Sequence, residues 1–279
     1  MRRTIGRTTV RDALDSAVVG LSAADCETPR LDAEVLLAHV LEVDRTALFL
    51  DPGRALDPEQ AGAFRDLVVR RREREPVSHL VGLRGFRHLE LAVDARVLTP
   101  RPETEHLVEA VLDLPRGARV VDVGTGSGAV ALALKDERPD LEVLATDVST
   151  DALDVAVQNA RGLGLDVAFF HGDLLDALEA DVRVDAVVSN PPYVRDGDPL
   201  PPEVARFEPA VALFGGPDGL DVVRRLVPQA VGRGARLVAL EVGQGQDGAV
   251  AELLRSAGAS TVHVVKDLAG IGRVVVGRC

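Results

Sequence analysis

The hydrophobic positions in the first 75 residues recur every three or four residues, which is the period of a helix with one buried face. Two sets of residues show this spacing: Val10, Leu14, Val18 and Leu21, then Leu31, Val35, Leu36 and Val40. A third short helix is expected over 44–50. A fourth has a clear start, because Asp57 can cap it, Pro58 suits its first position and Gln60 follows three residues after the cap. The pattern predicts a small helical domain over residues 1–75.

A run of charged residues ends the fourth predicted helix, at Arg70-Arg71-Arg72-Glu73-Arg74-Glu75. Such a run could contact RNA, but we interpret it as a solvated helix end that the helix dipole favours. After Pro76 the pattern changes. Glycines and prolines then interrupt short apolar pieces such as residues 89–93, which predicts a β-hairpin linker over 76–105.

From about residue 106, apolar runs typical of strands alternate with helical segments. Continuous Val, Leu and Ala runs suit strands buried on both faces of a parallel sheet, so the alternation predicts a Rossmann-like, doubly wound α/β sheet over 106–279. The last two strands are separated only by residues 267–271, too few for a parallel crossover, and should pair antiparallel. Strands are expected at 118–123, 141–146, 166–171, 184–189, 235–242, 260–266 and 272–278, and helices at 128–137, 149–162, 218–231 and 247–257.

Composition narrows the class of protein. Of the 279 residues, 46% are hydrophobic, which is enough for a core. The sequence contains no run of 18 apolar residues, so no membrane span is predicted. No apolar stretch follows the basic start at residues 1–3, so no secretory signal is expected, and two distant cysteines, Cys26 and Cys279, fit a reducing cytoplasm. The net charge of −12 argues against non-specific nucleic-acid binding. The six histidines lack the spacing of metal ligands, so we predict no metal: His39, His79, His88, His106, His171 and His263.

A glycine-rich loop follows the first strand of the predicted sheet and leads into a helix. It reads Asp122-Val123-Gly124-Thr125-Gly126-Ser127-Gly128. Glycines allow the backbone to approach a ligand, and a helix N-terminus favours a negatively charged group. At the end of the next strand, Asp147 can accept hydrogen bonds from both hydroxyls of a ribose. Nicotinamide and flavin sites prefer G-x-G-x-x-G, and here the third glycine comes one residue early. The loop instead resembles the first motif of S-adenosylmethionine-dependent methyltransferases; a glycine turn without a ligand is the alternative.

The third strand is followed by His171-Gly172-Asp173-Leu174. In methyltransferases of this kind, an acidic residue at this place resembles the one that accepts a hydrogen bond from the adenine amino group. Leu174 would then pack on the adenine ring. An ordinary helix N-cap explains Asp173 equally well.

The fourth strand ends at Asn190-Pro191-Pro192-Tyr193, on the edge of the sheet where open α/β proteins bind ligands. The prolines make this turn rigid and leave its carbonyls as acceptors. If Asn190 Oδ1 and the Pro191 carbonyl accepted both N–H groups of a planar –NH2, they would hold the nitrogen and favour its pyramidalisation. Tyr193, the single tyrosine, would offer an aromatic face. Positioning and polarisation then suffice for methyl transfer. An incidental Pro-Pro turn is the alternative.

Over nearly its whole length the chain resembles the bacterial peptide chain release factor N5-glutamine methyltransferases, a family of class I S-adenosylmethionine-dependent methyltransferases. Asn-Pro-Pro-Tyr also occurs in adenine-N6 and guanine-N2 methyltransferases, so other segments narrow the resemblance. The segments that carry it are Pro29–Leu37, Pro76–Leu80, Thr99–Glu105, Asp122–Gly128, Asn190–Tyr193, Arg206–Pro209, Gly215–Leu220, Asp267–Gly270 and Arg273–Arg278.

The resemblance implies a release-factor-docking domain at 1–75, joined by the linker to a methyltransferase domain at 106–279. The enzyme would methylate the side-chain amide N5 of the glutamine in the Gly-Gly-Gln motif of release factors and convert S-adenosylmethionine to S-adenosylhomocysteine. It implies Asn190, Pro191 and Tyr193 as catalytic, and Asn190 to Tyr193, Pro192 included, as substrate-binding. The cofactor residues would be Gly124, Thr125, Gly126, Ser127, Gly128, Asp147, Asp173, Leu174 and Asn190. Relatives often carry an aromatic in place of Leu174, so adenine packing would be weaker here.

Two other functions stay open. One is an N-methyltransferase of an exocyclic amino group in DNA or RNA, or of a ribosomal-protein glutamine; the acidic charge counts against the nucleic acid. The other is a S-adenosylmethionine-binding scaffold without catalysis, against which the intact Asn190–Tyr193 motif counts. We expect a cytoplasmic monomer whose partner is a release factor, with no membrane and no direct nucleic-acid contact. Arg101 and Glu103 either line the cofactor cleft or form structural ion pairs.

Overall fold

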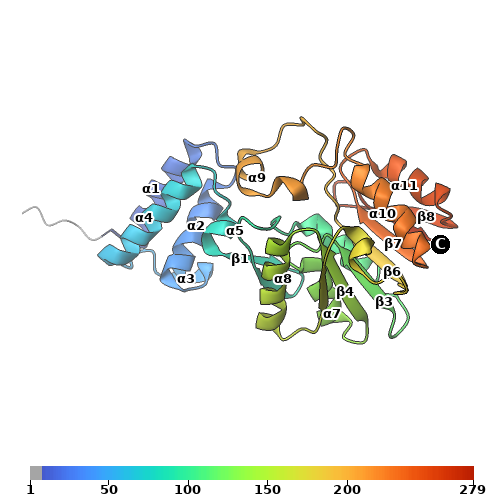
Figure 1. Ribbon diagram of the computed structural model, residues 1–279. Coiled ribbons are helices and arrows are strands. Elements are labelled where there is room, and N and C mark those ends of the chain that lie inside the picture. Colours follow the sequence, from blue (N-terminus) through green and yellow to red (C-terminus); the bar gives the residue numbers. More distant parts are fainter. Residues whose placement is uncertain (1–7) are drawn as a thin grey trace, which may run out of the picture. The chain divides into compact units, whose positions relative to one another are not determined.

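A computed structural model describes residues 8–279, which form two compact units (Figure 1). The first unit contains the chain up to Gly82 together with Pro201–Phe207, and the second contains Leu83–Leu200 and Glu208–Cys279. The start of the chain at residues 1–7, on which the expectation about a secretory signal depends, lies outside the described residues. The division falls within the segment predicted as a linker, 76–105, so the predicted boundaries at 75 and 105 stay predictions.

The first unit is helical, as the periodicity predicts. The predicted start of the fourth helix is confirmed: the Gln60 amide donates to Asp57 Oδ1 at 2.8 Å, and the Asp57 amide donates to Gln60 Oε1 at 3.2 Å. These two bonds satisfy amides that the helix itself leaves unpaired. Its helices are α1 (Val10–Ser22), α2 (Pro29–Leu41), α3 (Arg45–Leu50), α4 (Pro58–Arg72), α5 (Val77–Val81) and α9 (Pro202–Phe207).

The buried face of α2 differs from the one predicted. Leu31 is 42% exposed, whereas Asp32 and Glu34 are buried. Both carboxylates are paired: Arg71 Nε donates to Asp32 Oδ2 at 2.7 Å, and Arg45 Nη2 donates to Glu34 Oε2 at 2.8 Å. A buried carboxylate is tolerated when a cation and hydrogen bonds replace its water. Hydrophobic spacing alone therefore assigns the wrong face.

The interpretation of the charge run at 70–75 as a solvated helix end is wrong for two of its residues. Arg71 is buried, and Arg74 is held by Glu203 of α9, whose carboxylate accepts from Arg74 Nε at 2.7 Å and Nη2 at 2.8 Å. Arg71 also donates to Glu203, at 3.2 Å. These pairs explain why a segment some 130 residues further along the chain belongs to the helical unit.

A seven-stranded sheet dominates the second unit, in the order β5-β4-β3-β6-β7-β9-β8. β3 to β7 are mutually parallel, and β9 runs antiparallel to both of its neighbours. The doubly wound sheet and its antiparallel last strand are thus confirmed. The placement of β9 between β7 and β8 was not predicted. The strands are β3 (Arg119–Val123), β4 (Glu142–Asp147), β5 (Ala168–His171), β6 (Ala186–Ser189), β7 (Leu237–Glu241), β8 (Thr261–Lys266) and β9 (Gly272–Arg278).

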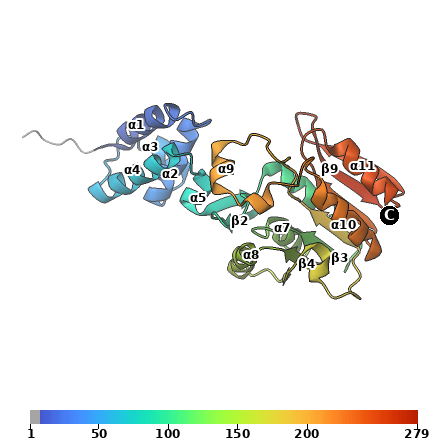
Figure 2. The same cartoon turned by 45° about the horizontal axis from the view of Figure 1, so that its top comes forward.

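Helices cover both faces of the sheet because alternate strand residues point to opposite sides. Val120 packs with α6 (Glu105–Glu109) and α7 (Ala129–Glu137), whereas its neighbour Val121 packs with α10 (Asp221–Gly232) and α11 (Asp247–Ser256). Figure 2 shows α7 and α11 apart from each other. The predicted hairpin is present as β1 (Leu83–Phe86) and β2 (Leu89–Ala92). The remaining elements are η1 (Pro102–Thr104), α6 (Glu105–Glu109), α7 (Ala129–Glu137), α8 (Thr150–Leu163), η2 (Leu174–Ala177), η3 (Ala210–Ala212), α10 (Asp221–Gly232) and α11 (Asp247–Ser256).

Candidate active site

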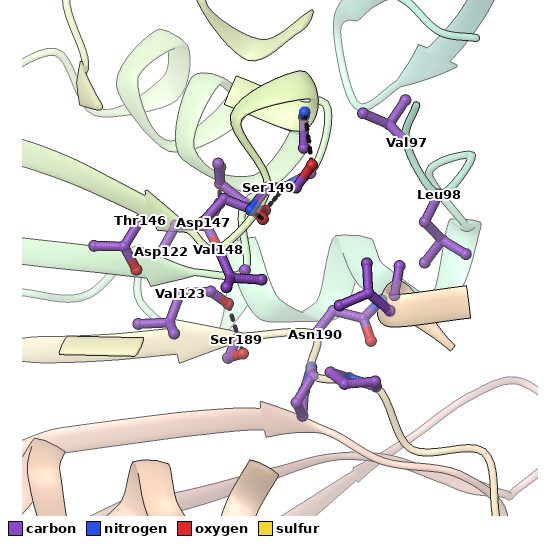
Figure 3. A pocket seen from close by; sticks show the side chains of 18 of the residues that line it. Val97, Leu98, Asp122, Val123, Thr146, Asp147, Val148, Ser149, Ser189 and Asn190 are labelled. Carbon is purple, nitrogen blue, oxygen red and sulfur yellow. Dashed lines mark hydrogen bonds between the residues drawn. The ribbon is translucent and has the colours of Figure 1, made fainter. Parts of the chain in front are cut away.

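A cavity of about 320 Å³ lies at the carboxyl ends of β3, β4 and β6. The strand order reverses between β3 and β6, and this switch point is where open α/β sheets bind ligands. Figure 3 shows Asn190 at the end of β6, with Asp147 and Ser149 on its left and Leu98 on its right. Most of the residues predicted for the site line this one cavity: Gly124, Thr125, Gly126, Ser127, Asp147, Asp173, Leu174, Asn190, Pro191 and Pro192.

Asp122, the last but one residue of β3, accepts hydrogen bonds from the glycine loop and from the helix that follows it. The Thr125 hydroxyl donates to Asp122 Oδ2 at 2.7 Å, and the Ala131 amide donates to the same oxygen at 3.2 Å. Burial raises the pKa of Asp122 to about 7 despite these bonds. Gly124 and Gly126 have φ of +72° and +57°, a region that residues with a side chain rarely adopt. The loop therefore needs both its glycines and its acid.

Gly128 stands apart from the other loop residues because it does not line the cavity. It is the N-cap of α7, with φ of +84°, and a Cβ there would lie 3.0 Å from Leu132 Cδ1. The structure thus gives Gly128 a packing role, and its predicted contact with a cofactor stays a prediction.

Asp147 ends β4 and faces the loop. Its Oδ2 accepts from the Gly126 amide and its Oδ1 from the Ser149 amide, each at 2.9 Å. Burial raises its pKa, and the backbone amides oppose that shift. Each carboxylate oxygen keeps a further lone pair, so the group can still accept from the two hydroxyls of a ribose.

Asp173 and Leu174 line the cavity at the start of η2. Asp173 forms an ion pair with Arg225 of α10, which also lines the cavity, and its side chain makes no capping hydrogen bond. Asp173 is nevertheless the N-cap residue of η2 by its place and backbone conformation, so both interpretations of Asp173 stay predictions. Leu174 has φ of +51°, uncommon for a residue with a side chain and typical of functional or strained positions.

The Asn190 amide has one donor engaged. Its Nδ2 donates to the Thr104 hydroxyl at 3.2 Å, and the preceding Ser189 Oγ donates to the Val123 carbonyl at 2.7 Å, tying β6 to β3. Within residues 8–279, neither Asn190 Oδ1 nor the Pro191 carbonyl accepts a hydrogen bond. Both residues line the cavity, and the predicted role of these two acceptors toward a substrate amide stays a prediction.

Tyr193 lies where the sequence did not place it. It does not line the cavity; its hydroxyl is 3.5 Å from Glu241 Oε1, and its backbone carbonyl accepts from Gln246 Nε2 at 3.0 Å. Burial, with Glu241 next in effect, raises its pKa to about 12, so the phenol keeps its proton. A ring face in contact with the substrate amide stays a prediction.

The segment Gly215–Leu220 packs against the backbone of the Asn190–Tyr193 motif. A Cβ at Gly215 would lie 2.3 Å from the Pro192 carbonyl oxygen, and a Cβ at Gly219 would lie 2.2 Å from that of Tyr193. Two backbone segments can approach each other this closely only where one of them has no side chain, which explains the glycines at these positions.

Arg101 both lines the cavity and forms an ion pair, so the two interpretations of it hold together. Its Nη2 donates to Glu208 Oε1 and Oε2, each at 2.7 Å, and the Thr99 amide donates to Oε1 at 3.3 Å. The Glu208 side chain is only 1% exposed. Burial raises the pKa of Glu208, and Arg101 opposes the shift.

Three residues contact the predicted site residues without having been predicted from the sequence: Thr104, Glu241 and Arg225. Thr104 and Glu241 are buried polar residues on segments far apart in the chain. A polar residue inside an apolar strand is one signal that could have pointed to Glu241. Nothing in the sequence pointed to Arg225, since an arginine in a predicted helix is expected to be exposed to solvent.

Comparisons with known proteins show which family the chain belongs to. The PrmC N-terminal domain family matches residues 12–82, and the methyltransferase small domain family matches residues 102–206. A release factor glutamine methyltransferase of Koribacter versatilis is 43% identical over 97% of this chain and 98% of its own. The chain belongs to the release factor glutamine methyltransferase family. A second member, from Rhodospirillum rubrum, is 44% identical over 95% of this chain and 83% of its own.

Family membership confirms the predicted class: the protein is a methyltransferase, and its family and fold imply S-adenosylmethionine as methyl donor. Among solved structures, a 16S rRNA N2 G1207 methyltransferase of Thermus thermophilus shares the fold. Its TM-score is 0.51 at 19% identity over 70% of this chain and 49% of the other. In the described part of the chain, no helix combines the length and apolarity needed to cross a membrane.

Proposed function

We propose that the protein transfers a methyl group from S-adenosylmethionine to the N5 amide nitrogen of the glutamine in the Gly-Gly-Gln motif of peptide chain release factors. One observation carries the proposal: within residues 8–279, Asn190 Oδ1 and the Pro191 carbonyl accept no hydrogen bond, and both residues line the cavity that the glycine loop also lines. Two adjacent acceptors suit a planar –NH2, which has two donors. Relatives over 40% identical carry the name release factor glutamine methyltransferase.

The residues of the cavity fit the cofactor. Its volume of about 320 Å³ lies in the range of small-molecule sites, and both apolar and polar residues line it. The Asp147 carboxylate would accept from the ribose hydroxyls, and Gly124 to Ser127 would lie against the rest of the cofactor. Asp173 would accept from the adenine amino group, and Arg225, its ion-pair partner, also lines the cavity. The cofactor supplies a methyl group on a sulfonium, which is a good leaving group.

The chain's own residues would then act by position and hydrogen bonding. With its two N–H groups on Asn190 Oδ1 and the Pro191 carbonyl, the substrate amide cannot rotate, and its nitrogen is drawn out of conjugation with its carbonyl. The lone pair becomes available at the place where the methyl group arrives. No base is required before transfer, because the proton leaves the nitrogen afterwards. We propose Tyr193 as a third catalytic residue, whose aromatic face would lie against the planar amide of the substrate.

We also propose that residues 1–75 dock the release factor, and that the enzyme works as a monomer in the cytoplasm. The acidic net charge supports a protein partner over nucleic acid. A ribosomal-protein glutamine and an exocyclic base amine are the alternative substrates, and both present the same planar nitrogen.

The test incubates the purified protein with release factor and isotope-labelled S-adenosylmethionine, followed by peptide mass analysis. We expect one methyl group on the glutamine of the Gly-Gly-Gln peptide, and none on a release factor in which alanine replaces that glutamine. Asn190→Ala should abolish transfer while it reduces cofactor binding only in part. Transfer to RNA, DNA or a ribosomal protein without transfer to the release factor would overturn the proposal, and full activity of Asn190→Ala would overturn the role of its amide.

A further inference from the structure

Three polar side chains, spaced four residues apart, connect α10 to the segment that follows β5. They are Arg225 and Gln229 of α10 and Arg233, which caps its C-terminal end, and this spacing places them on one side of the helix. We call them the α10 row. Their partners lie within residues 173–179, the segment whose first two residues line the cavity. The α10 row therefore contacts the part of the cavity wall that would meet the adenine.

Leu175 shows how closely this segment is bound. Its amide donates to Gln229 Oε1 at 3.0 Å, and its carbonyl accepts from Arg233 Nη2 at 2.8 Å. Arg233 also donates to the Leu178 carbonyl, at 3.1 Å. Both backbone groups of Leu175 are thus bonded to the α10 row. Leu175 is 0% exposed, so water does not replace a lost partner and each bond has a cost to break.

The residue just before Leu175 has an unfavourable backbone conformation. Leu174 has φ of +51°, and a leucine keeps such a conformation only where its surroundings impose it. Arg225 forms an ion pair with Asp173 on one side of Leu174, and Gln229 binds the Leu175 amide on the other side. The α10 row therefore fixes the strained residue from both of its neighbours.

The place of the ion pair between Asp173 and Arg225 indicates a role toward a ligand. The two side chains are 50% and 54% exposed, and a pair so exposed contributes little to folding stability. Both residues nevertheless line the cavity. Arg224, the other arginine of α10, pairs with Asp218 and does not line it. Of the two neighbouring arginines, Arg225 is thus the one whose partner faces the cofactor site.

We propose that Arg225 and Gln229 are positioning residues for the adenine end of the cofactor. They hold Asp173 and Leu174 at the cavity wall, so that the Asp173 carboxylate accepts from the amino group of the base. A purine with a carbonyl in place of that amino group would turn an acceptor toward the carboxylate and bind less tightly. The inference rests on the proposed function, which gives Asp173 the adenine amino group as its partner.

The first test measures the preference for the base by calorimetry. It compares S-adenosylhomocysteine with S-inosylhomocysteine, in which a carbonyl replaces the amino group. Wild type should bind the adenosine compound at least about tenfold more tightly, and Asp173→Ala should lose this preference. Arg225→Met and Gln229→Met should each reduce it by at least about threefold. Arg224→Met is the matched control, because its exposed pair with Asp218 lies off the cavity, and it should keep the wild-type ratio.

A double variant separates positioning from a contact of Arg225 with the cofactor. If Arg225 acts through Asp173, Asp173→Ala/Arg225→Met should bind S-adenosylhomocysteine within about twofold of Asp173→Ala alone. Losses that add in the double variant would mean that Arg225 contacts the cofactor itself or supports the fold, and would overturn its positioning role.

The second test observes the segment without a ligand. Hydrogen exchange of the Leu175 amide, followed by NMR in ¹⁵N-labelled protein, should be at least about tenfold faster in Gln229→Met than in wild type, because the amide loses its acceptor. In Arg224→Met the exchange rate should stay that of wild type.

The outcomes distinguish this inference from the proposed function. If wild-type protein transfers no methyl group to release factor, the proposed function fails. If transfer occurs but Asp173→Ala keeps the preference for the base, Asp173 does not bind the amino group and the inference fails alone. If Asp173→Ala loses the preference while Arg225→Met and Gln229→Met keep it, or if the Leu175 amide exchanges equally in Gln229→Met and wild type, the positioning role is wrong.

Discussion

The ion pair between Arg101 and Glu208 joins two of the segments that define the family resemblance, and its removal should destabilise the protein. In Arg101→Met, the Glu208 carboxylate loses two contacts of 2.7 Å while its side chain is 1% exposed. Leaving a buried charge without its partner costs about 3–5 kcal/mol. Arg101 is itself 35% exposed, so we expect the lower end, about 3 kcal/mol. For a domain of this size that lowers Tm by about 6–12 °C.

The assay is thermal unfolding of the full chain at pH 8, with two further variants. Arg255→Met is the matched control, because Arg255 and Glu252 form an exposed pair at 3.5 Å, which contributes under about 1 kcal/mol. The double variant Arg101→Met/Glu208→Gln should recover at least half of the loss, since no uncompensated charge remains. At pH 5 the deficit of Arg101→Met should shrink, because burial raises the pKa of Glu208 and the carboxyl then takes up a proton.

Two results would refute this reasoning. If Arg101→Met unfolds at the same temperature as Arg255→Met, the ion pair does not stabilise the fold. If the double variant is as unstable as Arg101→Met, the loss comes from the packing of the arginine side chain and not from the charge of Glu208.

Three further variants test other contacts of the site. Asp147→Asn places an NH2 group against the amide of Gly126 or Ser149, and calorimetry should show binding of S-adenosylhomocysteine weakened at least about tenfold, as expected for a lost hydrogen bond to a charged group. Gly215→Ala should lower kcat by more than about tenfold in a folded protein, because its Cβ would meet the Pro192 carbonyl oxygen at 2.3 Å and shift the catalytic turn. Glu241→Gln should be more stable than wild type at pH 8.5 by up to about 3 kcal/mol in urea unfolding, and this gain should vanish near pH 5.

The sign of the last prediction follows from the pKa of Glu241, which burial raises from 4.5 to about 7. Glu103 also raises this pKa, whereas Thr104, Arg273 and the Tyr193 hydroxyl lower it. The native state therefore binds the proton more tightly than the unfolded chain, and stability is lost as pH rises through 7.

Controls keep these variants interpretable. Asp166→Asn changes an exposed carboxylate of the same unit and should leave cofactor binding unaltered. Gly248→Ala adds a Cβ that meets nothing within 4 Å and should leave kcat unaltered. A Kd for Asp147→Asn equal to that of wild type, a fully active Gly215→Ala, or a Glu241→Gln gain that persists at pH 5 would each show that the contact in question was wrongly assigned.

Local patterns were sufficient to predict the fold class and the strands of the sheet. The period of apolar residues gave every strand of the sheet within two residues, because burial on both faces demands continuous apolar runs. Four residues of the cavity could be expected at one place from the sequence: Gly124, Asp147, Asp173 and Asn190. Each ends or follows a parallel strand, and the carboxyl ends of such strands share one edge of the sheet. The capping box of Asp57 and Gln60 could also be predicted from the sequence, because its two residues are only three positions apart.

Only the tertiary structure decided which polar residues are buried and what they contact. Asn190 contacts Thr104 across 86 positions of the chain, and Arg101 contacts Glu208 across 107. A periodic pattern assigns polar residues to solvent, so Arg71 was expected there, and nothing in the pattern pointed to a partner for Asp32 or Glu241. The position of β9 between β7 and β8, and the inclusion of Pro201–Phe207 in the helical unit, were equally hidden. Sequence determines where elements begin and end because those signals are local. The pairing of buried charges and strands is decided when distant segments pack together and each buried group must find its partner.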